Sequence, residues 1–387
     1  MTPTLKAIPG TFRHRARLYL ALGIANWAIF VGHIPDNIVN LLNLRNFGFS
    51  GPADLYVFSV GYGIAILHRR MARERGFIVA ATRIFHRVWR LYAAYVILFV
   101  IYIETIAYVA SQSTAPELLH EYNIAGILDH PLRLLVRGLM LQEEPTNLDL
   151  LQLMIPLMAF YPLVFWGLLR RPNFTLAASI ALYFGAIYFD WNFPIFPDRS
   201  WSYNPFCWQL LIVLGAWFAL TGAARRALRG MWWLRLLAGA YLLFALIITF
   251  AQHWPALVAY VPDFILDPFT PNGKGALPPC RILHWLALAF IATYLLPANH
   301  PALGWKSLQP IIKCGEQWLA VFCIGVFLSL AGHLILITGP QYVLMDIAVT
   351  LAGFAAMTAV AYYVSWSKQQ DSPAARQARP PHAIADR

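Results

Sequence analysis

Ten apolar stretches separated by polar segments form the most regular pattern along this chain. They lie at about residues 18–33, 52–67, 91–110, 150–169, 174–189, 205–222, 236–254, 282–297, 318–338 and 344–366. Each has a length at which an α-helix crosses most or all of a bilayer. The pattern predicts an all-α, polytopic membrane protein with about ten transmembrane helices over residues 18–366.

The composition agrees with this interpretation. Hydrophobic residues make up 59% of the 387 positions and charged residues 12%, which is too apolar for a water-soluble core. The first stretch follows a basic flank, as in a signal peptide, but bulky and polar residues replace a small-residue cleavage site. We therefore expect this helix to stay as a signal anchor. The cysteines and histidines lack the spacing of disulfide pairs or helical metal ligands, so we expect neither disulfides nor a bound metal.

The net charge of +11 suggests nucleic-acid binding, but the distribution of the charge excludes it. Loops on one side of the predicted bundle hold 23 of the 29 Lys and Arg residues. The other side holds Arg45, Arg133, Arg137, Arg199, Lys274 and Arg281. Because basic residues stay on the cytoplasmic side, this bias predicts a membrane protein with both termini in the cytoplasm and His33 on the outer side. The basic N-terminus covers residues 1–17, and the polar tail over 367–387 is expected to be disordered.

His33 is the leading catalytic candidate. It ends the first apolar stretch on the outer side, and imidazole takes up and releases protons near neutral pH. The alternative is that it only caps the helix at the membrane interface. Asp54 opens the second stretch in the same outer layer. It either orients the imidazole or favours the positive end of its own helix dipole.

The outer loops hold the candidate substrate-binding residues. The loop before residue 205 is rich in aromatic and amide side chains, a set that stacks on sugars and binds hydroxyls, although membrane interfaces are also rich in Trp and Tyr. A second long outer loop carries Lys274 and leads to His284, whose alternative role is a structural hydrogen bond. The candidates are Trp201, Tyr203, Asn204, Trp208, Lys274, His284 and Asp149.

Arginines crowd the segment between the second and third stretches, on the predicted cytoplasmic side. Such a block usually sets topology and lies on the anionic inner leaflet. Arg83 and Arg87 are also candidates for holding the phosphates of an acyl donor, because guanidinium groups pair well with phosphate oxygens.

Several segments together resemble one family, the OpgC succinyltransferases of osmoregulated periplasmic glucans, a branch of the acyltransferase 3 superfamily. They are GHIPDN (32–37), LRNFGFSGPADLYVF (44–58), PTNLDLLQL (145–153), YNPFCWQLLIVLGAW (203–217), RILHWLALA (281–289) and KCGEQWLAVFCIGVFLS (313–329). The resemblance implies ten spans and transfer of an acyl group, expected to be succinyl, from cytoplasmic acyl-CoA to hydroxyls of a periplasmic glucan. It also implies a location in the bacterial inner membrane and no permanently bound cofactor, and His33 matches the catalytic histidine.

The chain departs from the family pattern near this histidine. Leu22 and Tyr19 stand where the family usually has an arginine and an aspartate, and leucine cannot bind a phosphate or carboxylate as arginine does. Asp36 replaces a usual glycine and is a further catalytic candidate, since it adds a carboxylate beside His33. A glycan transporter or flippase, and a catalytically inactive member with a binding role, are the alternative functions.

Overall fold

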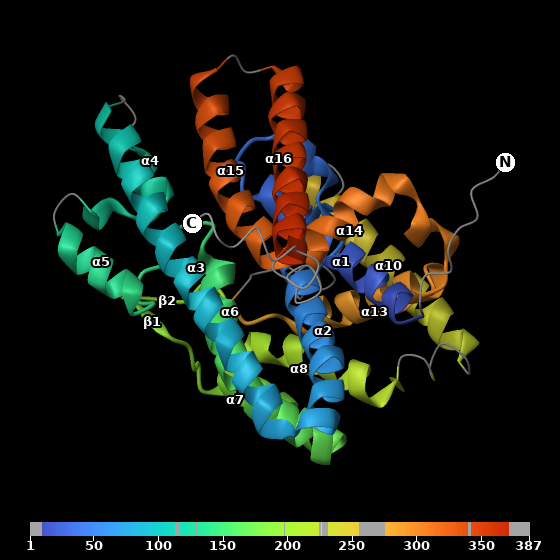
Figure 1. Ribbon diagram of the computed structural model, residues 1–387. Coiled ribbons are helices and arrows are strands. Elements are labelled where there is room, and N and C mark those ends of the chain that lie inside the picture. The colour runs from blue at the N-terminus through green and yellow to red at the C-terminus, as the bar shows by residue number, and fades with distance from the viewer. Residues whose placement is uncertain are drawn as a thin grey trace, which may run out of the picture. The chain divides into compact units, whose positions relative to one another are not determined.

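The computed structural model describes residues 10–112, 117–127, 130–196, 198–223, 226, 231–254, 275–339 and 342–370, and these are almost entirely helical (Figure 1). The chain divides into two compact units. The terminal unit takes its residues from Met1–Asn40 and Ala298–Arg387, and the central unit takes its residues from Leu41–Pro297.

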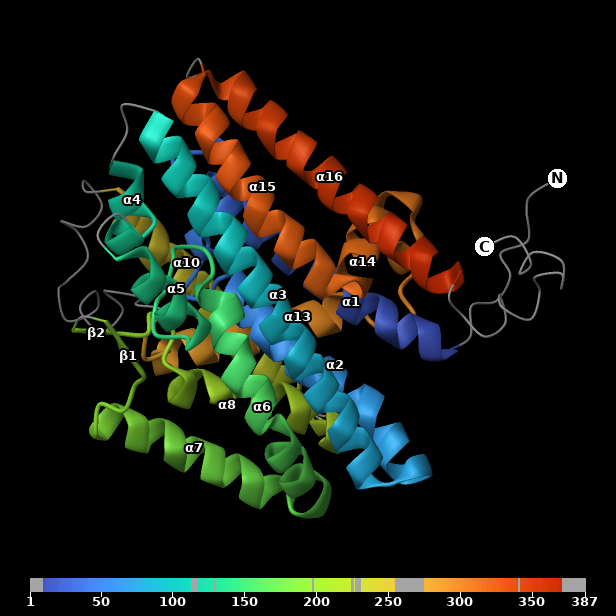
Figure 2. The ribbon, with the colours of Figure 1, turned by 60° about the vertical axis from the view of Figure 1, so that its left-hand side comes forward.

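The terminal unit is a small helical bundle. Its helices are α1 (Gly10–Gly32), α14 (Gln309–Glu316), α15 (Trp318–Thr338) and α16 (Val343–Gln370), with short 3-10 turns η5 (Pro301–Gly304) and η6 (Lys306–Leu308). Helices α15 and α16 lie side by side as a hairpin, and α1 packs on α14 and α15 (Figures 1 and 2). Phe30 and Val31 pack with Val321 and Met357 in the core. This packing fixes the end of α1, where His33 follows.

The central unit contains most of the helices. They are α2 (Pro52–Arg75), α3 (Phe77–Gln112), α4 (Glu117–Glu121), α5 (Pro131–Leu139), α6 (Asp149–Arg170), α7 (Pro172–Tyr188), α8 (Pro205–Thr221), α10 (Trp232–His253) and α13 (Pro279–Leu295), with 3-10 turns η1 (Ile38–Leu42), which begins in the terminal unit, η2 (Leu44–Asn46) and η3 (Ala125–Ile127). Helix α8 packs on α2, α6 and α7, α3 packs on α6, and α10 packs on α13. Glycines allow the closest approach, since a Cβ at Gly61 of α2 would collide with the Ile212 carbonyl of α8.

Local sequence explains where two helices of the central unit begin. Pro52 takes the first position of α2, where its missing N–H costs nothing, and the Asp54 carboxylate accepts a hydrogen bond from the Gly51 N–H at 2.7 Å. Asn204 caps α8 by accepting from the Phe206 N–H at 3.0 Å, and Pro205 follows it. These starts place Asp54 and Trp208 near the beginnings of their helices.

Each of the ten predicted apolar stretches coincides with one helix of the structure. The helices are α1, α2, α3, α6, α7, α8, α10, α13, α15 and α16. In the described part of the chain, five are long and apolar enough to cross a membrane, namely α3, α6, α15, α16 and residues 232–252 of α10. Helices α8 and α13 are apolar but shorter. A membrane protein follows from these helices, while the number of ten crossings stays a prediction.

A small strand pair departs from the all-helical prediction. Strands β1 (Pro194–Ile195) and β2 (Arg199–Ser200) pair antiparallel within the aromatic loop before α8. The Trp201 N–H continues the pairing by donating to the Phe193 carbonyl at 3.0 Å. The pairing satisfies backbone groups of a loop that packs inward, and it has no hydrophobic periodicity that a sequence reading could detect.

Candidate functional site

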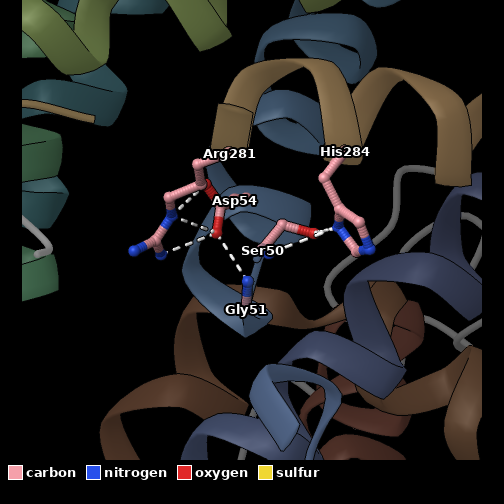
Figure 3. A network of polar contacts seen from close by, with 5 residues as sticks. All are labelled: Ser50, Gly51, Asp54, Arg281 and His284. Carbon is pink, nitrogen blue, oxygen red and sulfur yellow. Dashed lines mark hydrogen bonds and ion pairs between the residues drawn. The ribbon is translucent and has the colours of Figure 1, made fainter. Parts of the chain in front are cut away.

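Two polar pairs join the start of α2 to the start of α13 in the central unit (Figure 3). In the first pair the Arg281 guanidinium donates three hydrogen bonds to the Asp54 carboxylate, at 2.7 to 3.0 Å. Asp54 is fully buried and Arg281 is 6% exposed. A buried carboxylate and guanidinium in this geometry compensate each other's charge, and either alone would be costly.

The second pair joins Ser50 and His284, one helical turn from the first (Figure 3). The Ser50 Oγ lies 2.7 Å from His284 Nδ1, and the Ser50 backbone N–H points to the same nitrogen at 3.3 Å. A backbone N–H can only donate, so Nδ1 is the acceptor and a neutral ring carries its proton on Nε2. The Gly48 backbone lies directly against Nε2, where a Cβ would collide with the ring. His284 therefore has a hydrogen-bonding partner within the fold.

Aromatic side chains pack around the first pair. The Arg281 guanidinium lies 5.3 Å from the centre of the Trp208 ring, and Tyr203 meets that ring edge-on at 4.7 Å. Burial raises the pKa of Tyr203 well above its usual value, and the charges of Asp149 and Asp54 act in the same direction. Tyr203 is therefore a neutral phenol, able to donate a hydrogen bond, among these charged groups.

A buried glutamate borders the same cluster. The Glu144 carboxylate accepts from the Ser202 hydroxyl at 2.7 Å and from the Ser202 N–H at 3.1 Å. Burial raises the pKa of Glu144 to about 7, and Asp149 adds to the rise, although the Ser202 hydrogen bonds and Arg199 oppose it. Glu144 was missing from the sequence-based candidates. Its only sequence signal is the carboxylate pair Glu143–Glu144, which lies in a polar outer segment with Gln142, Thr146 and Asn147.

The predicted sugar-binding residues lie inside the central unit rather than on its surface. Trp201, Tyr203, Asn204 and Trp208 are 5, 5, 7 and 0% exposed. These four side chains are not exposed, because the loop folds back on itself and packs them together, and their contact with a sugar stays a prediction. The side-chain oxygen of Asn204 accepts a hydrogen bond from the Phe206 N–H at 3.0 Å, and its amide nitrogen donates to the Trp191 carbonyl at 2.7 Å. Trp191 itself is 47% exposed.

His33 and Asp36 belong to the terminal unit. His33 is half-buried directly after α1, and its N–H donates to the Ile29 carbonyl at 3.0 Å. The following turn is tied to α16, because Asn37 donates to Thr350 Oγ1 at 2.9 Å and the Ile38 N–H to Asp346 Oδ2 at 3.0 Å.

The backbone of Asp36 has a conformation that favours glycine. Asp36 is exposed, and its φ is +55°, a left-handed conformation that glycine adopts freely and Asp or Asn tolerates. Leu22, at the family's arginine position, is 3% exposed inside the terminal unit.

The remaining candidates are Arg83, Arg87, Asp149 and Lys274. Arg83 is exposed and Arg87 half-buried on α3, and the charges of both act on the buried His68 of α2. Asp149 is the first residue of α6, and its carboxylate accepts from the Leu150 N–H at 2.9 Å. Lys274 lies outside the described residues. Among those that are described, no three His, Cys, Asp or Glu side chains gather as a metal site.

The apolar helices and the buried polar pairs at their ends define a helical membrane protein. The OpgC protein family matches residues 14–369 of the sequence, so the chain belongs to this family. No curated protein and no solved structure matches the chain. Membership of the family suggests an acyltransferase with a function like that of a glucan succinyltransferase, and a glucan as the acceptor.

Proposed function

We propose that this protein is a membrane O-acyltransferase that moves a succinyl group from cytoplasmic succinyl-CoA to a hydroxyl of a periplasmic glucan. The family membership and the apolar helices support the reaction class and the membrane setting. The distribution of basic residues supports ten crossings with both termini in the cytoplasm. In this orientation His33 lies toward the acceptor side.

In the proposed mechanism His33 acts as general base. Its imidazole takes the proton of a glucan hydroxyl while that oxygen attacks the thioester carbonyl carbon. The carbon–sulfur bond then breaks, and the proton passes from the imidazolium to the leaving CoA thiolate. General-base catalysis of this kind contributes about a hundred- to ten-thousand-fold in rate.

The observation that carries this role is the anchoring of the His33 turn. The hydrogen bonds from Asn37 and Ile38 to α16 hold the residues after His33 in place, and the end of α1 holds those before it. A base must be positioned to within fractions of an ångström to be effective. Asp36, three residues along, is the carboxylate nearest to His33 in sequence within this unit.

Asp54 and the loop residues take positioning roles in this proposal. The Asp54 carboxylate is occupied by Arg281 and by the Gly51 N–H, which supports a role in holding α2 to α13. Tyr203 and His284 are proposed to shape the acceptor side together with Trp201, Asn204, Trp208, Lys274 and Asp149. Trp191 offers an exposed ring for a sugar. Arg83 and Arg87 are proposed to attract the donor phosphates.

Mass spectrometry of periplasmic glucans tests the reaction in cells. Glucans from cells with the gene are expected to carry an extra 100 Da, the mass of one succinyl substituent, that a deletion strain lacks and that wild-type complementation restores. A deletion strain with unchanged glucans, or with glucans missing from the periplasm altogether, contradicts acyl transfer. The second result is the one expected of a glycan transporter.

A further inference from the structure

An open pocket lies between the ends of α2 and α8, within the central unit. It has a volume of about 550 Å³ and is lined by Ile66, Arg69, Arg70, Arg73, Glu74 and Ala219. Three guanidinium groups and one carboxylate therefore face the same space. Sites for small organic ligands have volumes of about 300 to 1,000 Å³, so the pocket holds more than a single inorganic ion.

The three arginines of the pocket differ in their hydrogen bonds and ion pairs. Arg70 pairs with Glu74 at 2.7 Å, and this exposed pair offsets one positive charge with the one carboxylate of the lining. Arg69 donates to the Leu220 carbonyl at the end of α8, at 3.1 Å, which fixes its guanidinium at the pocket wall. Arg73 is exposed and makes no ion pair within the described residues. Two guanidinium groups thus remain uncompensated.

Charges on the neighbouring helix strengthen the positive potential. Arg83 and Arg87 of α3 both act on His68, the residue directly before Arg69. Guanidinium groups present paired N–H donors that match phosphate oxygens, and each such bond is stronger than one between neutral groups. Ile66 and Ala219 add an apolar wall beside the charged one. This combination suits a phosphate attached to a larger organic group.

We propose that this pocket binds a phosphate-bearing ligand between Arg69 and Arg73. Two molecules offer this chemistry at the membrane surface, namely the nucleotide end of an acyl-CoA and the headgroup of an anionic phospholipid. The first source rests on the proposed function, and the second is independent of it.

Binding of CoA to the full-length protein in phosphatidylcholine nanodiscs tests the first source. Arg69→Gln and Arg73→Gln are each expected to weaken binding about tenfold, the effect of losing one hydrogen bond to a charged group. Arg90→Gln, an exposed arginine of α3 outside the pocket, is the matched control and should bind as the wild type does. Size-exclusion profiles check that each variant is folded.

Native mass spectrometry of the same proteins in nanodiscs containing phosphatidylglycerol tests the second source. The amount of retained phosphatidylglycerol is compared between the variants. If it falls in both pocket variants but not in Arg90→Gln, and CoA binding is unchanged, the pocket binds a lipid headgroup. If neither CoA binding nor lipid retention changes in the pocket variants relative to the control, the proposal is wrong. Because no transfer is measured, a protein that binds CoA here but never acylates glucan would refute the proposed function and leave the pocket standing.

Discussion

Arg281 Nη2 and Asp54 Oδ2 lie 2.7 Å apart, although 227 positions separate the two residues along the chain. The contact joins the first turn of α13 to the first turn of α2, and both side chains are buried. The Ser50–His284 pair makes a second link between the same two segments. These links hold the polar cluster of the central unit in place.

Removal of one partner of this ion pair is expected to be strongly destabilising. Asp54→Ala leaves a buried guanidinium without its carboxylate and should cost about 3 to 5 kcal/mol of unfolding free energy. Arg281→Lys should also lose stability, because an ammonium cannot make the same paired bonds. Thermal unfolding in detergent measures both effects.

The exposed Arg70–Glu74 pair provides the control for that experiment. Its side chains are 77 and 55% exposed, and Glu74→Ala should leave the melting temperature almost unchanged, because water screens an exposed ion pair. An Asp54→Ala variant as stable as Glu74→Ala would show that the buried pair does not hold the helices together.

Glu144 should make the stability of the protein depend on pH. Its folded pKa of about 7 lies above the ordinary value of 4.5, so between these values the folded state keeps a proton that the unfolded chain has lost. Stability therefore falls as pH rises from about 4.5 through 7, by up to about 3 kcal/mol in all. The apparent melting temperature in detergent at several pH values measures this slope.

Glu144→Gln keeps an oxygen for Ser202 but cannot ionise. Its melting temperature should change less between pH 5 and 8 than that of the wild type. Identical slopes for the two proteins would mean that Glu144 titrates outside this range.

The left-handed backbone of Asp36 sets which residues that position accepts. The unfolding free energies of Asp36→Gly and Asp36→Asn should lie within about 1 kcal/mol of the wild-type value, since Gly and Asn both tolerate a φ of +55°. Asp36→Val should lose about 1 to 2 kcal/mol more unfolding free energy than Asp36→Gly, because a β-branched side chain collides with its own backbone at this φ. Equal stability of the Val and Gly variants would contradict the assigned backbone conformation.

The helices could be predicted from the sequence because their signals are local. The predicted apolar stretches that begin at about residues 52 and 205 match the starts of α2 and α8, and each of the ten stretches coincides with a helix. Helix ends were less predictable. Helix α2, for example, continues to Arg75, well past the apolar stretch that ends near residue 67, since Arg and Glu have high helix propensity.

The contacts of the candidate site could not be read from the sequence. No local pattern pairs Arg281 with Asp54, because the pairing depends on how α2 and α13 pack. The burial of Trp201 and Trp208 was not predictable either, since a Trp that packs inside a loop and a Trp at a membrane interface have the same local surroundings in sequence. The role of His33 stays a prediction, which rests on its position at the end of an apolar helix and on the family resemblance.

Transfer of label from radiolabelled succinyl-CoA to purified glucan tests the central claim most directly. The wild type, His33→Ala and His86→Ala are compared in nanodiscs at equal amounts of folded protein, with His86 as an exposed histidine of α3. The account predicts labelled glucan from the wild type and from His86→Ala, and a loss of at least a hundredfold in His33→Ala. Wild-type rates from a folded His33→Ala variant would contradict the assignment of His33 as the base.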